Sequence, residues 1–176
     1  MRARERPHAY EGLSRMDALR VGVVTSSDSC AAGTKQDGSG PALVDLVEAR
    51  GWILAGYRLC SDDDEQLAAA IVELADVAGA DVVLTTGGTG FGPRDVAPEV
   101  TARVCDRMVP GIAEHIRAES AKVTPRAMLS RGVAGLRGRT LVVNLPGSVK
   151  AARESFGFVA DQFEHAVQMI AGGGHD

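Results

Sequence analysis

A glycine-rich stretch in the middle of the chain contains the residue types best suited to chemistry. The apolar run Val82–Leu84 predicts a buried strand of a parallel sheet, and four glycines follow it between Gly87 and Gly92. Glycine lets the backbone approach a ligand closely, so that several N–H groups can converge on an anion. Threonine hydroxyls and the charges of Arg94 and Asp95 lie in the same loop. We therefore predict a phosphate-binding loop, whose contacts would come from Thr86, Gly87, Gly88, Thr89, Gly90 and Arg94.

The loop matches neither of the common phosphate-binding motifs. A P-loop requires a lysine and a hydroxyl residue after its last glycine, but Pro93 and Arg94 follow Gly92 here. The dinucleotide fingerprint Gly-x-Gly-x-x-Gly also fails, because the third glycine comes one residue early, and this argues against a nicotinamide-dependent oxidoreductase. For the loop taken alone, a sharp turn from strand to helix with no ligand is the alternative interpretation.

Three other segments concentrate polar side chains at the ends of predicted strands. They are Thr25–Asp28, Ser61–Asp64 and Asn144–Ser148. The carboxyl ends of parallel strands share one edge of an open α/β sheet, and ligands bind there. We therefore expect Asp28, Asp62 and the turn Asn144–Ser148 to line one pocket with the glycine loop and Asp95.

The run Asp62–Asp64 has two interpretations. Acidic residues at the start of a helix are favoured by the helix dipole, so the run could serve only as a helix cap. Together with Asp95, it could instead bind Mg²⁺, which takes one or two carboxylates and completes its shell with water and substrate phosphates. Carboxylates beside a phosphate loop favour such a cation, and the sequence leaves open which of the three neighbouring aspartates binds it.

The hydrophobic pattern of the whole chain predicts strands that alternate with helices. Strands are expected at 19–26, 52–59 and 82–85, and helices near 39–51, 65–78, 98–104 and 111–122. The segments 133–136 and 140–145 predict a hairpin, and a single long helix capped by Ser148 is expected over 149–170. This order predicts an α/β domain over 18–170 with a mostly parallel sheet. A flexible arm at 1–17 and a flexible tail at 171–176 are expected to flank it.

Composition and charge argue against several classes of function. The chain has 176 residues, enough for one domain, and its net charge of −4 and aromatic content of 4% argue against nucleic-acid binding. No apolar stretch approaches the ~18 residues that span a membrane, and the start of the chain lacks the apolar segment of a secretory signal. The cysteines Cys30, Cys60 and Cys105 are far apart and fit a reducing cytoplasm. No Gly-x-Ser-x-Gly sequence is present, so hydrolysis by a serine nucleophile has no support.

Taken together, the motifs resemble the MoaB/Mog family of molybdenum-cofactor biosynthesis, specifically the molybdopterin adenylyltransferases. The resemblance covers about residues 18–170, in the order of the family's motifs. The matching residues are Ser26–Asp28 with Gly33 and Asp37, Ser61–Asp63, Thr85–Gly90 with Arg94–Glu99, Ser130 with Arg131, and Asn144–Ser148. One departure is Ser61, which stands where a proline commonly precedes the first catalytic aspartate of the family.

The resemblance implies a three-layer α/β/α sandwich that assembles as a homotrimer. It also implies an enzyme that transfers AMP from ATP to the phosphate of molybdopterin and releases pyrophosphate, with Mg²⁺ required. The two catalytic aspartates, which would also hold the metal, match Asp62 and Asp95. The implied molybdopterin contacts are Ser26, Ser27, Asp28, Ser120, Ser130, Arg131, Asn144, Pro146, Gly147 and Ser148. A molybdenum-insertion protein is the implied downstream partner.

The residue inventory suits this reaction. The attacking group is a phosphate monoester, already anionic at pH 7, so the site needs no general base and must supply positioning and charge neutralisation. Backbone N–H groups, Mg²⁺ and the guanidinium of Arg94 or Arg131 would supply both. A protein of the same fold that binds molybdopterin without catalysis, or acts as a scaffold, is the alternative, and the presence of both Asp62 and Asp95 argues against it.

Overall fold

A six-stranded mixed sheet forms the centre of the protein in a computed structural model, which describes residues 18–172. The strands lie in the order β2 (Ile53–Cys60), β1 (Arg20–Ser26), β3 (Val82–Thr86), β6 (Thr140–Leu145), β5 (Ala134–Arg137) and β4 (Arg107–Met108). β2, β1, β3 and β6 run parallel, whereas β5 and β4 are antiparallel to their neighbours. The predicted hairpin is therefore confirmed as β5–β6. The arm at 1–17 and the tail beyond Gly172 lie outside the described residues.

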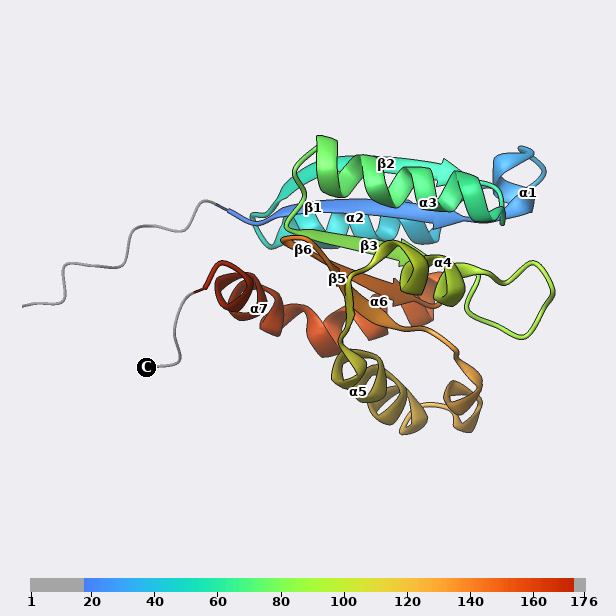
Figure 1. The fold of residues 1–176 in the computed structure, drawn as a ribbon. Coiled ribbons are helices and arrows are strands. Elements are labelled where there is room, and N and C mark those ends of the chain that lie inside the picture. The colour runs from blue at the N-terminus through green and yellow to red at the C-terminus, as the bar shows by residue number, and fades with distance from the viewer. Residues whose placement is uncertain (1–17, 173–176) are drawn as a thin grey trace, which may run out of the picture.

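Helices cover both faces of the sheet, so the predicted three-layer α/β/α architecture is confirmed (Figure 1). Alternate strand residues point to opposite layers: Val21 and Val23 belong to one core and Val24 to the other. The first core packs against α2 (Ser39–Ala49), α5 (Pro110–Ala121), α6 (Val149–Val159) and α7 (Phe163–Ile170), and the second against α3 (Asp64–Val72) and α4 (Ala97–Val104).

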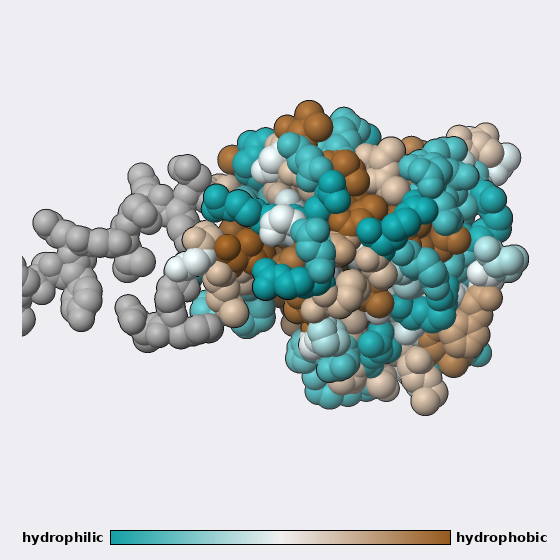
Figure 2. All heavy atoms as spheres, in the orientation of Figure 1, coloured by the Kyte–Doolittle hydropathy of each residue, from teal (hydrophilic) through white to brown (hydrophobic). Residues whose placement is uncertain are grey.

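The burial of the central strands explains why their sequences are apolar throughout. Every residue of β3 and β6 is buried, because parallel strands with helices on both faces have no solvent side. Figure 2 shows the corresponding exterior, where hydrophobic residues occur in separate areas among hydrophilic ones. Within the described part of the chain, no helix is long and apolar enough to cross a membrane.

The prediction of one helix over 149–170 is wrong. α6 ends at Val159, a 3₁₀ turn follows at Ala160–Gln162, and α7 begins at Phe163. The apolar periodicity continues across this break, so the sequence pattern hides it. The predicted cap is confirmed, since the Ser148 hydroxyl accepts a hydrogen bond from the N–H of Ala151 at 3.3 Å.

Several short elements were not predicted. A one-turn helix, α1 (Asp28–Ala31), follows β1, and a five-residue π-helical turn at Glu73–Val77 extends α3. A 3₁₀ helix at Pro125–Leu129 follows α5, and β4 contains two residues. Elements this short have too few residues to show a hydrophobic period.

An aromatic cluster joins the two parts of the C-terminal helical segment to the sheet. The ring centroids of Phe156 in α6 and Phe163 in α7 are each 6.1 Å from the ring centroid of Trp52, which precedes β2. The Trp52 indole N–H also donates to Glu164 at 3.0 Å. Phe156 and Phe163 therefore pack against one indole ring from the two sides of the helix break.

Truncation of Phe156 tests the importance of this cluster. Phe156 is 1% exposed, so Phe156→Ala should lower the free energy of unfolding by about 3–5 kcal/mol in urea denaturation. Phe158→Ala is the matched control, because Phe158 lies in the same helix but only partly buried, and it should cost less. Equal losses at the two positions would contradict the packing described here.

Candidate active site

The carboxyl ends of the four parallel strands open into one pocket of about 540 Å³. Segments far apart in the sequence form it, as expected for the edge of an open α/β sheet. The lining residues are Thr25–Ser27, Cys30, Lys35–Ser39, Asp62, Thr86–Gly88 and Gly147–Val149. The predicted neighbours Asp62, Gly87 and Ser148 therefore share one pocket, although each follows a different strand.

The backbone at Gly87 brings three of these strand ends together. Gly87 has a φ of +98°, and a Cβ atom there would lie 2.2 Å from the carbonyl oxygen of Ser26. The Gly87 N–H donates to the Leu145 carbonyl at 3.2 Å, and a Cβ on Gly147 would lie 3.2 Å from the Gly87 Cα. Only glycine is compatible with both this φ and this close approach.

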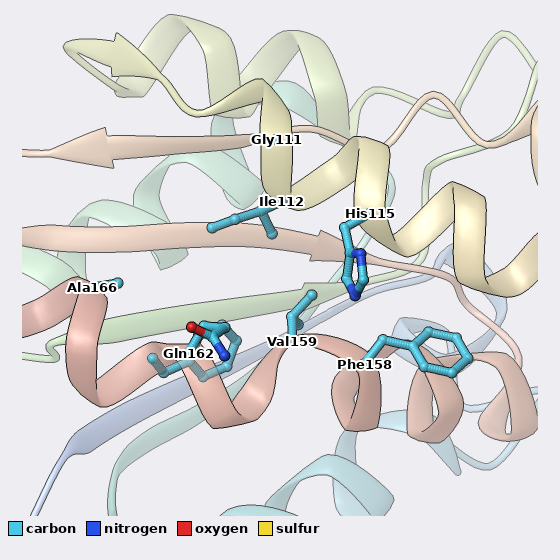
Figure 3. Close-up of a pocket in the computed structure, with 8 residues that line it drawn as sticks. Gly111, Ile112, His115, Phe158, Val159, Gln162 and Ala166 are labelled. Atoms are coloured by element: carbon cyan, nitrogen blue, oxygen red, sulfur yellow. The ribbon is translucent and has the colours of Figure 1, made fainter.

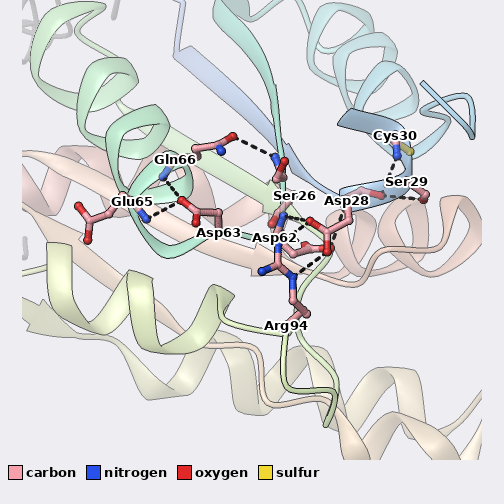
Figure 4. Close-up of polar contacts among 11 residues, drawn as sticks. Ser26, Asp28, Ser29, Cys30, Asp62, Asp63, Glu65, Gln66 and Arg94 are labelled. Carbon is pink, nitrogen blue, oxygen red and sulfur yellow. Dashed lines mark hydrogen bonds and ion pairs between the residues drawn. The ribbon is translucent and has the colours of Figure 1, made fainter. Parts of the chain in front are cut away.

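The carboxylate of Asp62 is fixed by the end of β1. It accepts hydrogen bonds from the Ser26 hydroxyl at 2.8 Å and from the Asp28 N–H at 2.9 Å, one on each oxygen. In return, the Asp62 N–H donates to the Asp28 carboxylate at 3.0 Å (Figure 4). Each Asp62 oxygen accepts a single hydrogen bond, so both retain lone pairs that can face a cation.

Asp28 lies beside the pocket and forms an ion pair with the glycine loop. Arg94 donates two hydrogen bonds of 2.8 Å to the two Asp28 oxygens, and its side chain reaches across from the loop to α1 (Figure 4). The hydrogen bonds from Arg94 hold the pKa of the Asp28 carboxyl below its ordinary value. Neither residue lines the pocket. To bind a phosphate there, the Arg94 guanidinium would have to release the Asp28 carboxylate.

The side chains of Asp95 and Arg131 form hydrogen bonds with the backbone of the glycine loop. The Asp95 carboxylate accepts the Gly92 N–H at 2.8 Å, and the Arg131 guanidinium donates to the carbonyls of Gly90 at 2.7 Å and Asp95 at 2.6 Å. Arg131 also forms an ion pair with Glu99. The expectation that Asp95 lines the same pocket as Asp62 is therefore not met, because its carboxylate faces the backbone of its own loop.

Asn144 and the two predicted serines also lie outside the pocket lining. Ser120 lies in the last turn of α5, where its carbonyl accepts N–H groups of the following turn. The Ser130 hydroxyl accepts the Gly132 N–H at 3.3 Å. Arg117 donates to the carbonyls of both Ser130 and Gly132. These residues form a group beyond the glycine loop, separate from the 540 Å³ pocket.

The side-chain amide of Asn144 forms three hydrogen bonds inside the protein. It donates to the hydroxyls of Thr85 and Thr101 at 2.8 Å each and accepts the Val133 N–H at 3.2 Å. The side chain is 3% exposed and connects β6 with β3, α4 and the segment that enters β5. The family resemblance implied a ligand contact at Asn144, whereas in the structure its side chain forms hydrogen bonds inside the protein.

One wall of the pocket, Lys35–Ser39, was not predicted as part of the site. The sequence singles out only Asp37 there, as a motif match. The Asp37 carboxylate accepts hydrogen bonds from the Tyr57 hydroxyl and from the Gly40 N–H. Burial acts to raise the pKa of Asp37, but the hydrogen bonds from Tyr57 and from backbone N–H groups outweigh it, so the pKa is lowered. The same burial and contact raise the pKa of Tyr57 to about 12.

Two further features limit what the site can do. Within residues 18–172, no group of three or more His, Cys, Asp or Glu side chains is arranged to hold a metal ion. Among the described residues that line the pocket there is no histidine, and the Cys30 thiol is the one sulfur nucleophile. The arrangement thus supplies hydroxyls, backbone N–H groups and a few charges, which bind an anionic ligand rather than attack it.

Comparison with known proteins gives a consistent result. Residues 22–165 match a family model described as "Probable molybdopterin binding domain". The molybdopterin adenylyltransferase of Helicobacter pylori J99 is 35% identical over 161 residues, which cover 89% of this chain and 90% of that protein. The Escherichia coli K12 molybdopterin adenylyltransferase is 37% identical over 83% of this chain and 76% of that protein. The crystal structure of the molybdopterin biosynthesis enzyme MoaB from Thermus thermophilus superposes with a TM-score of 0.82 at 44% identity, over 88% of this chain and 97% of that one.

Removal of the Asn144 amide tests its internal role. Asn144→Ala leaves two buried hydroxyls and one backbone N–H without their partner, so the free energy of unfolding should fall by about 1–3 kcal/mol. Chemical denaturation measures this directly. An unchanged unfolding midpoint together with weakened molybdopterin binding would show that the side chain serves the ligand instead.

Proposed function

Because the chain belongs to the molybdopterin-binding domain family, we propose that it is a molybdopterin adenylyltransferase. It transfers AMP from ATP to the phosphate of molybdopterin and releases pyrophosphate. The observation that carries this proposal is the pocket itself, in which Asp62 lies beside the backbone of Gly87 and Gly88 and the start of α6.

The chemistry requires positioning more than acid–base catalysis. A terminal oxygen of the molybdopterin phosphate attacks the α-phosphorus of ATP, and the bond to the pyrophosphate oxygen breaks. The nucleophile is already ionised at pH 7, so the absence of histidine from the described lining is no obstacle. Held in line, the two phosphates gain the rate advantage of an intramolecular reaction.

The glycine loop and the start of α6 are suited to hold these phosphates. Gly87 and Gly88 expose backbone without side chains, and Gly147 and Ser148 lead into the first turn of α6. N–H groups at a helix start and in a glycine turn attract anions. We assign the nucleotide phosphates to Thr86–Gly90 and Arg94, and the molybdopterin to Ser26–Asp28 with Pro146–Ser148. Ser120, Ser130 and Arg131 lie outside the pocket lining, and we assign them to a part of the molybdopterin that extends beyond the pocket.

We further propose that Mg²⁺ takes part and that Asp62 and Asp95 hold it. Within the described residues, no cluster of three or more His, Cys, Asp or Glu side chains could hold the ion without substrate. Mg²⁺ commonly takes one or two carboxylates and completes its shell with substrate phosphates and water. Asp62 and Asp95 fit an ion that binds together with the substrate. The free lone pairs of Asp62 support its part, whereas the Asp95 carboxylate would have to face away from Gly92. The ion would neutralise charge on the triphosphate. The hydrogen bonds from Ser26 and Asp28 fix the Asp62 carboxylate that would hold the ion.

Assembly and location belong to the same proposal. An apolar groove of about 160 Å³ lies between α5 and the α6–α7 segment, with Ile112, His115 and Phe158 on its walls (Figure 3). A second apolar groove adjoins it at Met169 and Ile170. We take these grooves as support for assembly into a homotrimer.

The free thiols of Cys30, Cys60 and Cys105 support a location in a reducing cytoplasm. A molybdenum-insertion protein is the proposed recipient of the product.

Neighbouring aspartates provide a matched test of catalysis. Asp62→Asn keeps the shape of the side chain and removes its charge, so adenylyl transfer should fall about a hundred-fold or more; Asp95→Asn should do the same. Asp63→Asn is the control, because Asp63 caps α3 through the N–H groups of Glu65 and Gln66 and should leave the rate nearly unchanged. Release of pyrophosphate at saturating ATP measures all three.

The result for Asp62→Asn decides whether this carboxylate takes part in catalysis. Near wild-type transfer by this variant, with its fold intact by circular dichroism, would make the carboxylate structural. Binding of molybdopterin without any AMP transfer by the wild-type protein would instead favour a non-catalytic member of this family.

The oligomeric state has its own test. Light scattering at micromolar concentration should give three times the 18.4 kDa mass of the chain, because the apolar grooves on α5 and α7 would be covered by a second copy. A monomer mass would refute the trimer and leave the chemistry of the pocket untouched.

A further inference from the structure

One residue supplies all of the positive side-chain charge in the described lining of this pocket. Among the described residues that line it, Lys35 is the sole cation, while Asp37 and Asp62 are anions. The two arginines nearest the site are engaged elsewhere, Arg94 with Asp28 and Arg131 with the carbonyls of the glycine loop. Within residues 18–172, the Lys35 ammonium has no ion-pair partner.

We propose that the ammonium of Lys35 binds a phosphate group of the substrate in this pocket. The inference deepens the proposed function and rests on it, since it names the residue that recognises the ligand's negative charge. Phosphate is the shared chemistry of both substrates, the nucleotide and molybdopterin. Lysine is well suited to it, because an ammonium on a flexible stem acts as a point charge that can follow the anion.

The backbone around Lys35 is held in place, so the side chain starts from a defined position. α1 ends in a turn at Gly33, whose φ is +73°. After this turn, the carbonyl of Ser29 accepts the N–H groups of Thr34 at 3.0 Å and Lys35 at 3.1 Å, and the hydroxyl of Thr34 at 3.0 Å. Three hydrogen bonds to one carbonyl therefore anchor the segment that presents Lys35 to the pocket.

Neither lining carboxylate forms an ion pair with Lys35, which leaves its ammonium for a ligand. Asp37 accepts from Tyr57 and from the backbone of Gly40, and Asp62 accepts from Ser26 and Asp28. With Lys35 the side chains of the lining carry one net negative charge, and without it they carry two. A polyanion entering this pocket would meet repulsion that Lys35 reduces.

The test compares Lys35→Gln with Lys35→Arg by isothermal titration. Lys35→Gln should weaken binding of ATP and pyrophosphate, probes that carry phosphate, by about tenfold, and leave adenosine unchanged. Lys35→Arg keeps the charge and should recover most of the affinity. Lys122→Gln is the matched control, since Lys122 pairs with Glu119 on α5, outside the pocket lining, and should bind each probe normally.

A parallel arm with molybdopterin identifies which phosphate Lys35 meets. Loss of ATP and pyrophosphate affinity assigns it to the nucleotide, and loss of molybdopterin affinity alone assigns it to the pterin phosphate; either supports the inference. Wild-type affinity of Lys35→Gln for all three ligands overturns it, even if AMP transfer is observed. Conversely, weakened phosphate binding in a protein that transfers no AMP would sustain the inference and reject the proposed enzyme.

Discussion

The close approach of Gly87 to the end of β1 is the constraint on which the pocket depends. A Cβ at Gly87 would overlap the Ser26 carbonyl, at 2.2 Å, so any other residue would push β1 and β3 apart at their carboxyl ends. The same backbone contacts Gly147, which leads from β6 into α6. Three of the four parallel strands thus deliver their polar residues to one place because two glycines lack side chains.

The polar groups that converge there are shared between segments rather than left free. Asp28 and Asp62 exchange backbone and side-chain hydrogen bonds, which ties the end of β1 to the end of β2. Arg94 then joins Asp28 to the glycine loop, and Arg131 holds that loop from the opposite side. Charges at the rim are therefore paired, while the interior of the pocket consists mainly of hydroxyls and backbone. The hydroxyls and backbone N–H groups of such a site are held in position before an anion binds.

The sequence predicted the sheet and the pocket edge well because both depend on local patterns. Apolar runs such as Val82–Leu84 give β3 within one residue, and residues after parallel strands must meet at one edge. The inward direction of Asn144 could not be predicted, since every residue of β6 is buried and no alternation distinguishes its two faces. The turn of the Asp95 carboxylate onto Gly92 and the bracing by Arg131 depend on loop geometry and on contacts distant in sequence.

Two other failures have the same physical origin. The break between α6 and α7 leaves the apolar period intact, so only the packing of Phe156 and Phe163 on Trp52 reveals it. Lys35 lies in a polar loop without periodicity, and its place in the pocket follows from the turn at Gly33 and the carbonyl of Ser29. Contacts between segments, which hydrophobic patterns do not encode, decide both cases.

The most direct measurement is a transfer assay with ATP labelled at its α-phosphate. The protein is incubated with molybdopterin, labelled ATP and Mg²⁺, and the products are separated. We expect label on the pterin in an amount equal to that of the released pyrophosphate, because the pocket holds the two phosphates in line. Recovery of unchanged molybdopterin and ATP from a protein that binds both would contradict it.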